Sequence, residues 1–138
     1  MSLIQSFARW IFAAFCSATA ATLTLALQLG AISLVYGLHE DGPAGVALLV
    51  TLVSLMVAAP IFFAGAAVLG APIASFMVRR QLDRPLPSAV TGATLTTGAG
   101  VALLWAIPGP PGLLLAIALP LAGAVGGLVF REAWLIRP

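Results

Sequence analysis

The chain has 138 residues, of which 62% are hydrophobic and only 7% are charged. A soluble domain usually carries about 25% charged residues, because water must wet its surface. Six arginines and four acidic residues are too few for that, so the composition excludes an ordinary soluble domain and indicates an all-α integral membrane protein. The arginines lie at the ends of hydrophobic segments, where they indicate membrane topology and not nucleic-acid binding.

The first hydrophobic run begins beside Arg9 and carries Ala18 and Ala20, a pattern that partly resembles a secretory signal with its cleavage site. The run continues to Tyr36, well beyond the roughly 7–15 residues of a signal core. We therefore interpret it as a retained transmembrane helix over residues 10–38. At about 1.5 Å per residue, this helix exceeds a hydrocarbon core of about 30 Å, so we expect it to tilt or protrude.

Three further spans follow in the chain. The second is predicted over residues 46–70 with an extension to 78, the third over 88–107 and the fourth over 113–130. Prolines interrupt two of them, since a proline removes a backbone donor, and we expect a kink near Pro60. The candidate pathway or kink residues are Gln28, Pro60 and Pro120. Gln28 is the one amide in a predicted span, and a hydrogen bond across a helix interface is favoured over ligand binding there.

Small residues recur at fourfold spacing along three of these spans. This spacing places side chains on one face of a helix, and small side chains let two helix backbones approach closely in lipid. We predict that these faces lie against protein and not against lipid. The predicted packing residues are Ala14, Ala18, Thr22, Ala26, Gly30, Gly92, Thr96, Gly100, Gly123 and Gly127.

Two polar connections separate the spans. The first contains His39, Glu40 and Asp41, whose adjacent positions are a poor metal cage, so a solvated turn is favoured and no metal is predicted. The second is the basic loop 79–87, with Arg79, Arg80 and Arg84. These arginines are interpreted as topology anchors, and the alternative is that they contact anionic lipid headgroups or an acidic patch on a partner.

The arginines predict the orientation of the chain. With four spans, all six arginines fall on one side of the membrane, and Glu40 and Asp41 fall on the other. The positive-inside rule then places both termini and the basic loop in the cytoplasm, most simply at a bacterial inner membrane. The prediction is one transmembrane domain over residues 1–138, built from two hairpins that each run in, out and in again. A repeat relating residues 21–24 to 93–96 is left open.

The predicted spans contain no acidic, basic or histidine side chain, which argues against an ion-coupled transporter acting alone. A haem held by two histidines is excluded because the chain has one histidine. Cys16 has no base beside it in its span, so a cysteine nucleophile is not supported. We therefore predict neither an enzyme nor a bound cofactor, although a lipid, quinone or pigment between helices is left open.

Two functions remain. The first is an accessory subunit that packs against a larger membrane complex, because the small-residue faces offer more contact surface than one bundle needs. The second is a small homo-oligomeric channel or transporter for a neutral or lipidic molecule. The expected partners are accordingly the lipid bilayer and other membrane subunits or further copies of the chain.

Overall fold

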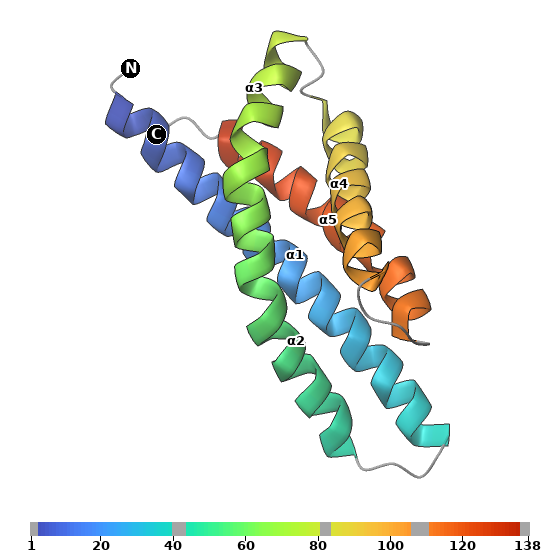
Figure 1. Cartoon of the computed structure of the whole chain (residues 1–138). Helices are drawn as coiled ribbons and strands as arrows, with labels where there is room; N and C mark the ends of the chain where they lie inside the picture. Colours follow the sequence, from blue (N-terminus) through green and yellow to red (C-terminus); the bar gives the residue numbers. More distant parts are fainter. Residues whose placement is uncertain (1–2, 40–43, 81–83, 106–110, 136–138) are drawn as a thin grey trace.

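The computed structural model describes the backbone of residues 3–39, 44–80, 84–105 and 111–135 (Figure 1). Side chains are described for residues 5–35, 45–70, 72–80, 84–102 and 117–135. The expected all-helical fold is confirmed, because every described element is a helix. The elements are α1 (Leu3–His39), α2 (Ala44–Gly65), the π-helix η1 (Ala66–Gly70), α3 (Ala71–Arg79), α4 (Pro85–Trp105) and α5 (Pro111–Leu135).

Helix α1 is 37 residues long and therefore measures about 55 Å at 1.5 Å per residue. It includes the predicted span 10–38 and begins earlier, at Leu3. Its run of alanine and leucine favours a helix, and a helix satisfies every interior backbone donor and acceptor without water. Helix α1 packs against two neighbours, α2 and α5.

The second segment is one rod made of α2, η1 and α3. Pro60, where a kink was expected, lies inside α2, and a departure from α-helical hydrogen bonding occurs further along, at η1. The physical reason lies at Pro72, which has no N–H and whose ring collides with the carbonyl four residues earlier. A π-turn widens the helix at this point, between Gly65 and Gly70. Gly70 keeps helical angles, φ −61° and ψ −48°, so α3 continues directly from η1.

Helices α4 and α5 each begin at a proline, Pro85 and Pro111. Proline suits a first turn because the N–H that it lacks would have no helical partner there. At the start of α4, the Ser88 amide donates a hydrogen bond to the Arg84 carbonyl oxygen at 3.2 Å. Helix α5 extends to Leu135, five residues beyond the predicted end, and so includes Arg131.

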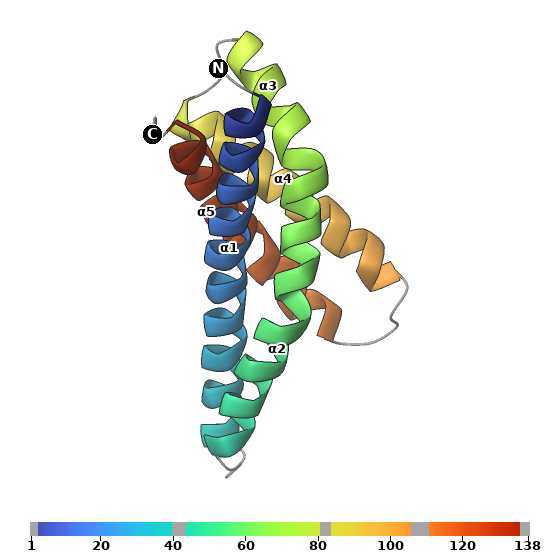
Figure 2. The ribbon, with the colours of Figure 1, turned by 90° about the vertical axis from the view of Figure 1, so that its left-hand side faces the viewer.

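The four long helices pack in the spatial order α2, α1, α5, α4. Helix α1 packs against α2 and α5, and α5 also packs against α4. The start of α1, the end of α3, the start of α4 and the end of α5 lie at one end of the molecule (Figures 1 and 2). The α2–α3 rod and α4 are thus two outer arms on a central pair.

Three segments within the described residues are long and apolar enough to cross a membrane: Gln5–Val35, Gly45–Gly70 and Ile117–Leu135. Helix α4 is not among them, since serine, threonine and proline lower the hydropathy of its described positions. The interior is built mainly from alanine, and its buried hydrophobic residues include Ala13, Ala14, Ala118 and Ala122. Because such side chains are small, the core is thin and the helix axes lie close together.

Candidate functional site

The predicted small-residue row of α1 is buried. Ala14, Ala18, Thr22 and Ala26 are between 0% and 5% exposed. At the far end of the row, Gly30 approaches α2 so closely that an added Cβ would lie 2.2 Å from Thr51 Oγ1. The row therefore lies against protein along its described length.

A second row on α1 forms the seam with α5. The Ser17 hydroxyl donates to the Gly126 carbonyl oxygen at 2.9 Å, and a Cβ added at Gly126 would lie 3.1 Å from the Ala21 Cβ. This buried hydrogen bond joins the two central helices. In lipid, polar contacts of this kind hold helices together, because the hydrophobic effect does not drive one helix against another there.

The seam between α4 and α5 is made by glycine. A Cβ added at Gly92 would lie 2.1 Å from the Gly123 oxygen, and one at Gly127 would lie 2.3 Å from the Ser88 oxygen. The Gly123 position is also closed by Thr96, at 2.5 Å from an added Cβ. The two backbones are thus in direct contact. Gly100 packs less rigidly, against the flexible Leu119 side chain.

These two tight seams leave a groove between the outer arms. The α2–α3 rod forms one wall, α4 forms the other, and α1 and α5 form the floor (Figure 1). The groove has a volume of about 550 Å³. Its walls are mostly apolar, with residues such as Val57, Phe62, Leu69, Ile73 and Leu95.

Three of the five hydroxyls among the described lining residues donate within the protein, and the other two belong to Ser54 and Thr96. Ser17 donates to Gly126, and the Thr91 hydroxyl donates to the Pro87 carbonyl oxygen at 2.7 Å. The Ser88 hydroxyl donates to the Arg84 carbonyl oxygen at 3.0 Å. A hydroxyl that bonds its own helix one turn earlier presents little polarity to a guest, so the walls favour hydrocarbon.

Arginines gather at one end of the groove. The helix ends at this end carry Arg9, Arg79, Arg80, Arg84 and Arg131, and Glu132 is the sole acid among the described residues (Figures 1 and 2). Of these arginines, Arg131 lines the groove. The sequence indicated Arg131 only as a topology charge, and it indicated Arg79, Arg80 and Arg84 as topology anchors with lipid or partner contact as the alternative. Those three are not among the lining residues.

Trp134 lies at the same end of the groove. Its ring lines the groove and stacks on Phe130, with the ring centroids 6.0 Å apart. The Arg9 guanidinium donates to the Trp134 backbone oxygen and lies 5.9 Å from the centroid of its ring. These contacts join α1 to α5 beside the arginines.

The candidate pathway residues are not brought together. Pro60 lines a separate hollow of about 360 Å³ between α1 and α2, with Thr22 and Phe63. Gln28 and Pro120 line neither cavity. The Gln28 side-chain nitrogen is buried and has no hydrogen-bond partner within the described part of the chain, so the expected bond across an interface is not found there.

Other candidates offer less chemistry. In the described ranges, no three His, Cys, Asp or Glu side chains lie together as metal ligands. The turn at Glu40 and Asp41 lies outside the described residues, as does the side chain of His39. Cys16 packs half-buried as a free thiol beside the cluster of Ala13 and Phe130.

Comparison with protein-family models, curated proteins and solved structures finds no match to this chain. The groove and the charges at its end are therefore the features that bear on function.

Proposed function

We propose that this protein is a four-span integral membrane protein that binds one chain-bearing lipid in the groove between its two arms. As the fourth span, α4 has 21 residues and a length of about 31 Å, which matches a hydrocarbon core of about 30 Å. Both ends of the chain and the basic loop lie on the cytoplasmic side. This orientation is supported by the arginines that share one end of the molecule.

The observation that carries the proposal is the size and lining of the groove. Its volume of about 550 Å³ falls within the range of about 300–1,000 Å³ found for small-molecule sites. Flexible hydrocarbon chains suit the apolar walls of this groove.

The lining also favours binding over reaction chemistry. Arg131 is the one ionisable side chain among the described lining residues. General acid–base catalysis needs a group that gains or loses a proton near the working pH, and arginine stays protonated. We therefore expect a molecule in this groove to be bound, oriented or transported, and not to be chemically changed.

Two glycines allow a sharp test. Gly65 lines the groove, and an added Cβ there would meet no atom within 4 Å; the same is true of Gly98, which lies outside the groove on α4. Gly65→Leu should fill the groove without disturbing a helix seam, and Gly98→Leu is the matched control. Both changes replace glycine by a better helix former.

The measurement is native mass spectrometry after exchange into detergent with defined lipids. Wild type and Gly98→Leu should retain one lipid per chain, and Gly65→Leu should lose most of it. Equal retention by Gly65→Leu and Gly98→Leu would refute the proposal.

One observation favours the accessory-subunit function as a second candidate. Thr94, Gly98 and Ala102 form an exposed fourfold row on α4, on positions that do not line the groove. Such a row would suit a close helix from a partner or from a second copy. Gly98→Leu should then abolish a stoichiometric complex in mild detergent while lipid retention stays unchanged.

A further inference from the structure

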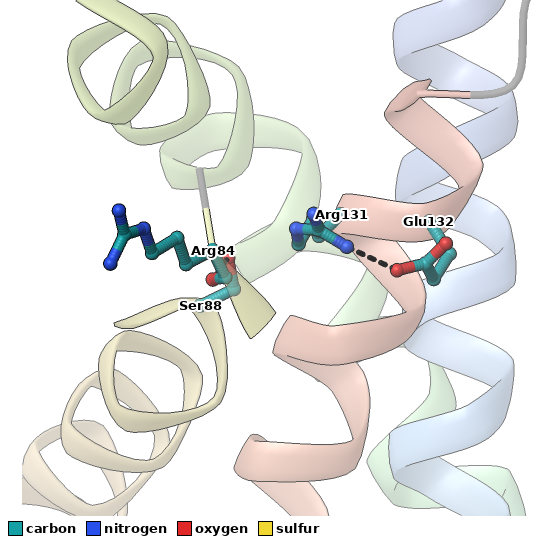
Figure 3. A network of polar contacts seen from close by, with 4 residues as sticks. All are labelled: Arg84, Ser88, Arg131 and Glu132. Carbon is teal, nitrogen blue, oxygen red and sulfur yellow. Dashed lines mark hydrogen bonds and ion pairs between the residues drawn. The ribbon is translucent and has the colours of Figure 1, made fainter. Parts of the chain in front are cut away.

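The end of the groove beside Arg131 distinguishes it from a purely apolar site. Arg131 lies on α5, and its side chain is 22% exposed while that of Glu132 is 66% exposed. The guanidinium donates to Glu132 Oε1, and Figure 3 shows this pair together with Arg84 and Ser88. Arg131 thus stands at the boundary between the apolar walls and the basic end of the molecule.

The charge at this end is strongly unbalanced. Among the described residues, the helix ends that meet there carry five arginines and one glutamate. Asp83, between Arg80 and Arg84 in the sequence, offsets part of this charge, and the remaining excess attracts an anion. The ion pair with Glu132 does not cancel this attraction, because a pair with an exposed carboxylate contributes little. Guanidinium also matches phosphate oxygens in geometry, since its donors form a planar fork.

On the basis of the proposed lipid-binding function, we infer that the bound lipid is an anionic phospholipid whose phosphate lies against Arg131. Its hydrocarbon chains run along the groove past Leu95 and Leu69. The lipid is taken from the membrane leaflet on the arginine side. Charge complementarity and the apolar groove select this occupant together. A free anion does not use the groove, a neutral chain does not use Arg131, and the arginines repel the choline cation of a zwitterionic phospholipid.

The test compares lipids with identical chains and different headgroups. Wild-type protein is mixed with phosphatidylglycerol, phosphatidylcholine or diacylglycerol, and retained lipid is counted by native mass spectrometry. We expect phosphatidylglycerol to be retained about fivefold more than diacylglycerol, the effect of one well-placed basic residue. Arg131→Gln should remove this preference and keep diacylglycerol binding. Arg131→Lys, which keeps the charge but not the fork, should retain part of the preference and serves as the second variant if Arg131→Gln does not fold.

Arg84→Gln measures the general effect of charge at this end. Arg84 has the same charge, does not line the groove and points away from Arg131 in Figure 3. We expect its substitution to lower the preference by less than about twofold, because exposed charges are screened. An equal loss in Arg84→Gln and Arg131→Gln would overturn the inference, as would an unchanged preference in Arg131→Gln.

Two further measurements separate the inference about the headgroup from the proposed lipid-binding function on which it rests. Inorganic phosphate at millimolar concentration should not displace phosphatidylglycerol; displacement would identify a site for free anions and overturn the inference. Gly65→Leu should lower retention of all three lipids. If Gly65→Leu lowers the retention of none of the three lipids, the proposed lipid-binding function is refuted. If the wild type retains lipid but shows no headgroup preference, only the inference of an anionic lipid is refuted.

Discussion

Gly92 on α4 and Gly123 on α5 face each other across a backbone contact. A Cβ added to either would lie 2.1 Å or 2.4 Å from the backbone oxygen of the other. No side chain can move aside there, because the obstructing atoms belong to the backbone. This pair sets how closely α4 approaches α5, and therefore where the α4 wall of the groove stands.

Gly123→Leu should destabilise the protein. The added side chain meets the Gly92 oxygen and Thr96, and overpacking of this kind typically costs about 1–3 kcal/mol. The expected result is a lower thermal midpoint in detergent. Gly98→Leu is the control, since its Cβ meets no atom within 4 Å. Equal midpoints for these two variants would contradict the close contact.

Ser17→Ala tests the seam between α1 and α5. The variant loses the buried hydrogen bond to Gly126 and leaves that carbonyl without this donor. Interhelical bonds in membranes contribute about 0.6 kcal/mol on average, so we expect a small decrease in unfolding free energy. Thr19→Ala is the matched control, because the Thr19 hydroxyl bonds its own helix at Phe15 and is exposed. Steric-trapping measurements in bicelles resolve such differences, and a larger loss in Thr19→Ala would contradict the assignment.

Pro72→Ala should restore a regular α-helix through η1. The new N–H can reach the carbonyl of Val68, so the wide turn at 66–70 loses its cause. We expect slower amide hydrogen exchange over these residues. Pro60→Ala, inside α2, should change exchange only in its own turn; a similar change at 66–70 in both variants would rule out Pro72 as the cause.

The proposed topology can be read by cysteine labelling in a Cys16→Ser background. Leu86 is 75% exposed at the arginine end, and Gly45 is exposed at the start of α2. An impermeant maleimide added to intact cells should label Gly45→Cys, and it should label Leu86→Cys only after permeabilisation. Labelling of Leu86→Cys in intact cells would exclude a cytoplasmic basic end.

The helices and their packing faces could be predicted from local patterns. Apolar runs longer than a bilayer indicate helices because no other open structure satisfies its backbone in lipid. The row from Ala14 to Ala26 indicates a contact face because small residues at fourfold spacing fall on one side. Even the irregular turn has a local origin, since η1 ends two residues before Pro72.

The groove was decided by the tertiary structure. Leu69, Leu95 and Phe62 line it, yet nothing in the sequence distinguishes them from Leu48 or Met56, which face outward. The physical reason is that lipid is as apolar as a leucine side chain. A leucine therefore gains no hydrophobic free energy when it contacts protein instead of lipid, so apolar residues are not restricted to one face of a helix. The close contact of Gly92 with Gly123 fixes the position of α4, and the groove lies between α4 and the α2–α3 rod. Arg131 is a site residue because its place on α5 lines this groove, which its position in the sequence does not indicate.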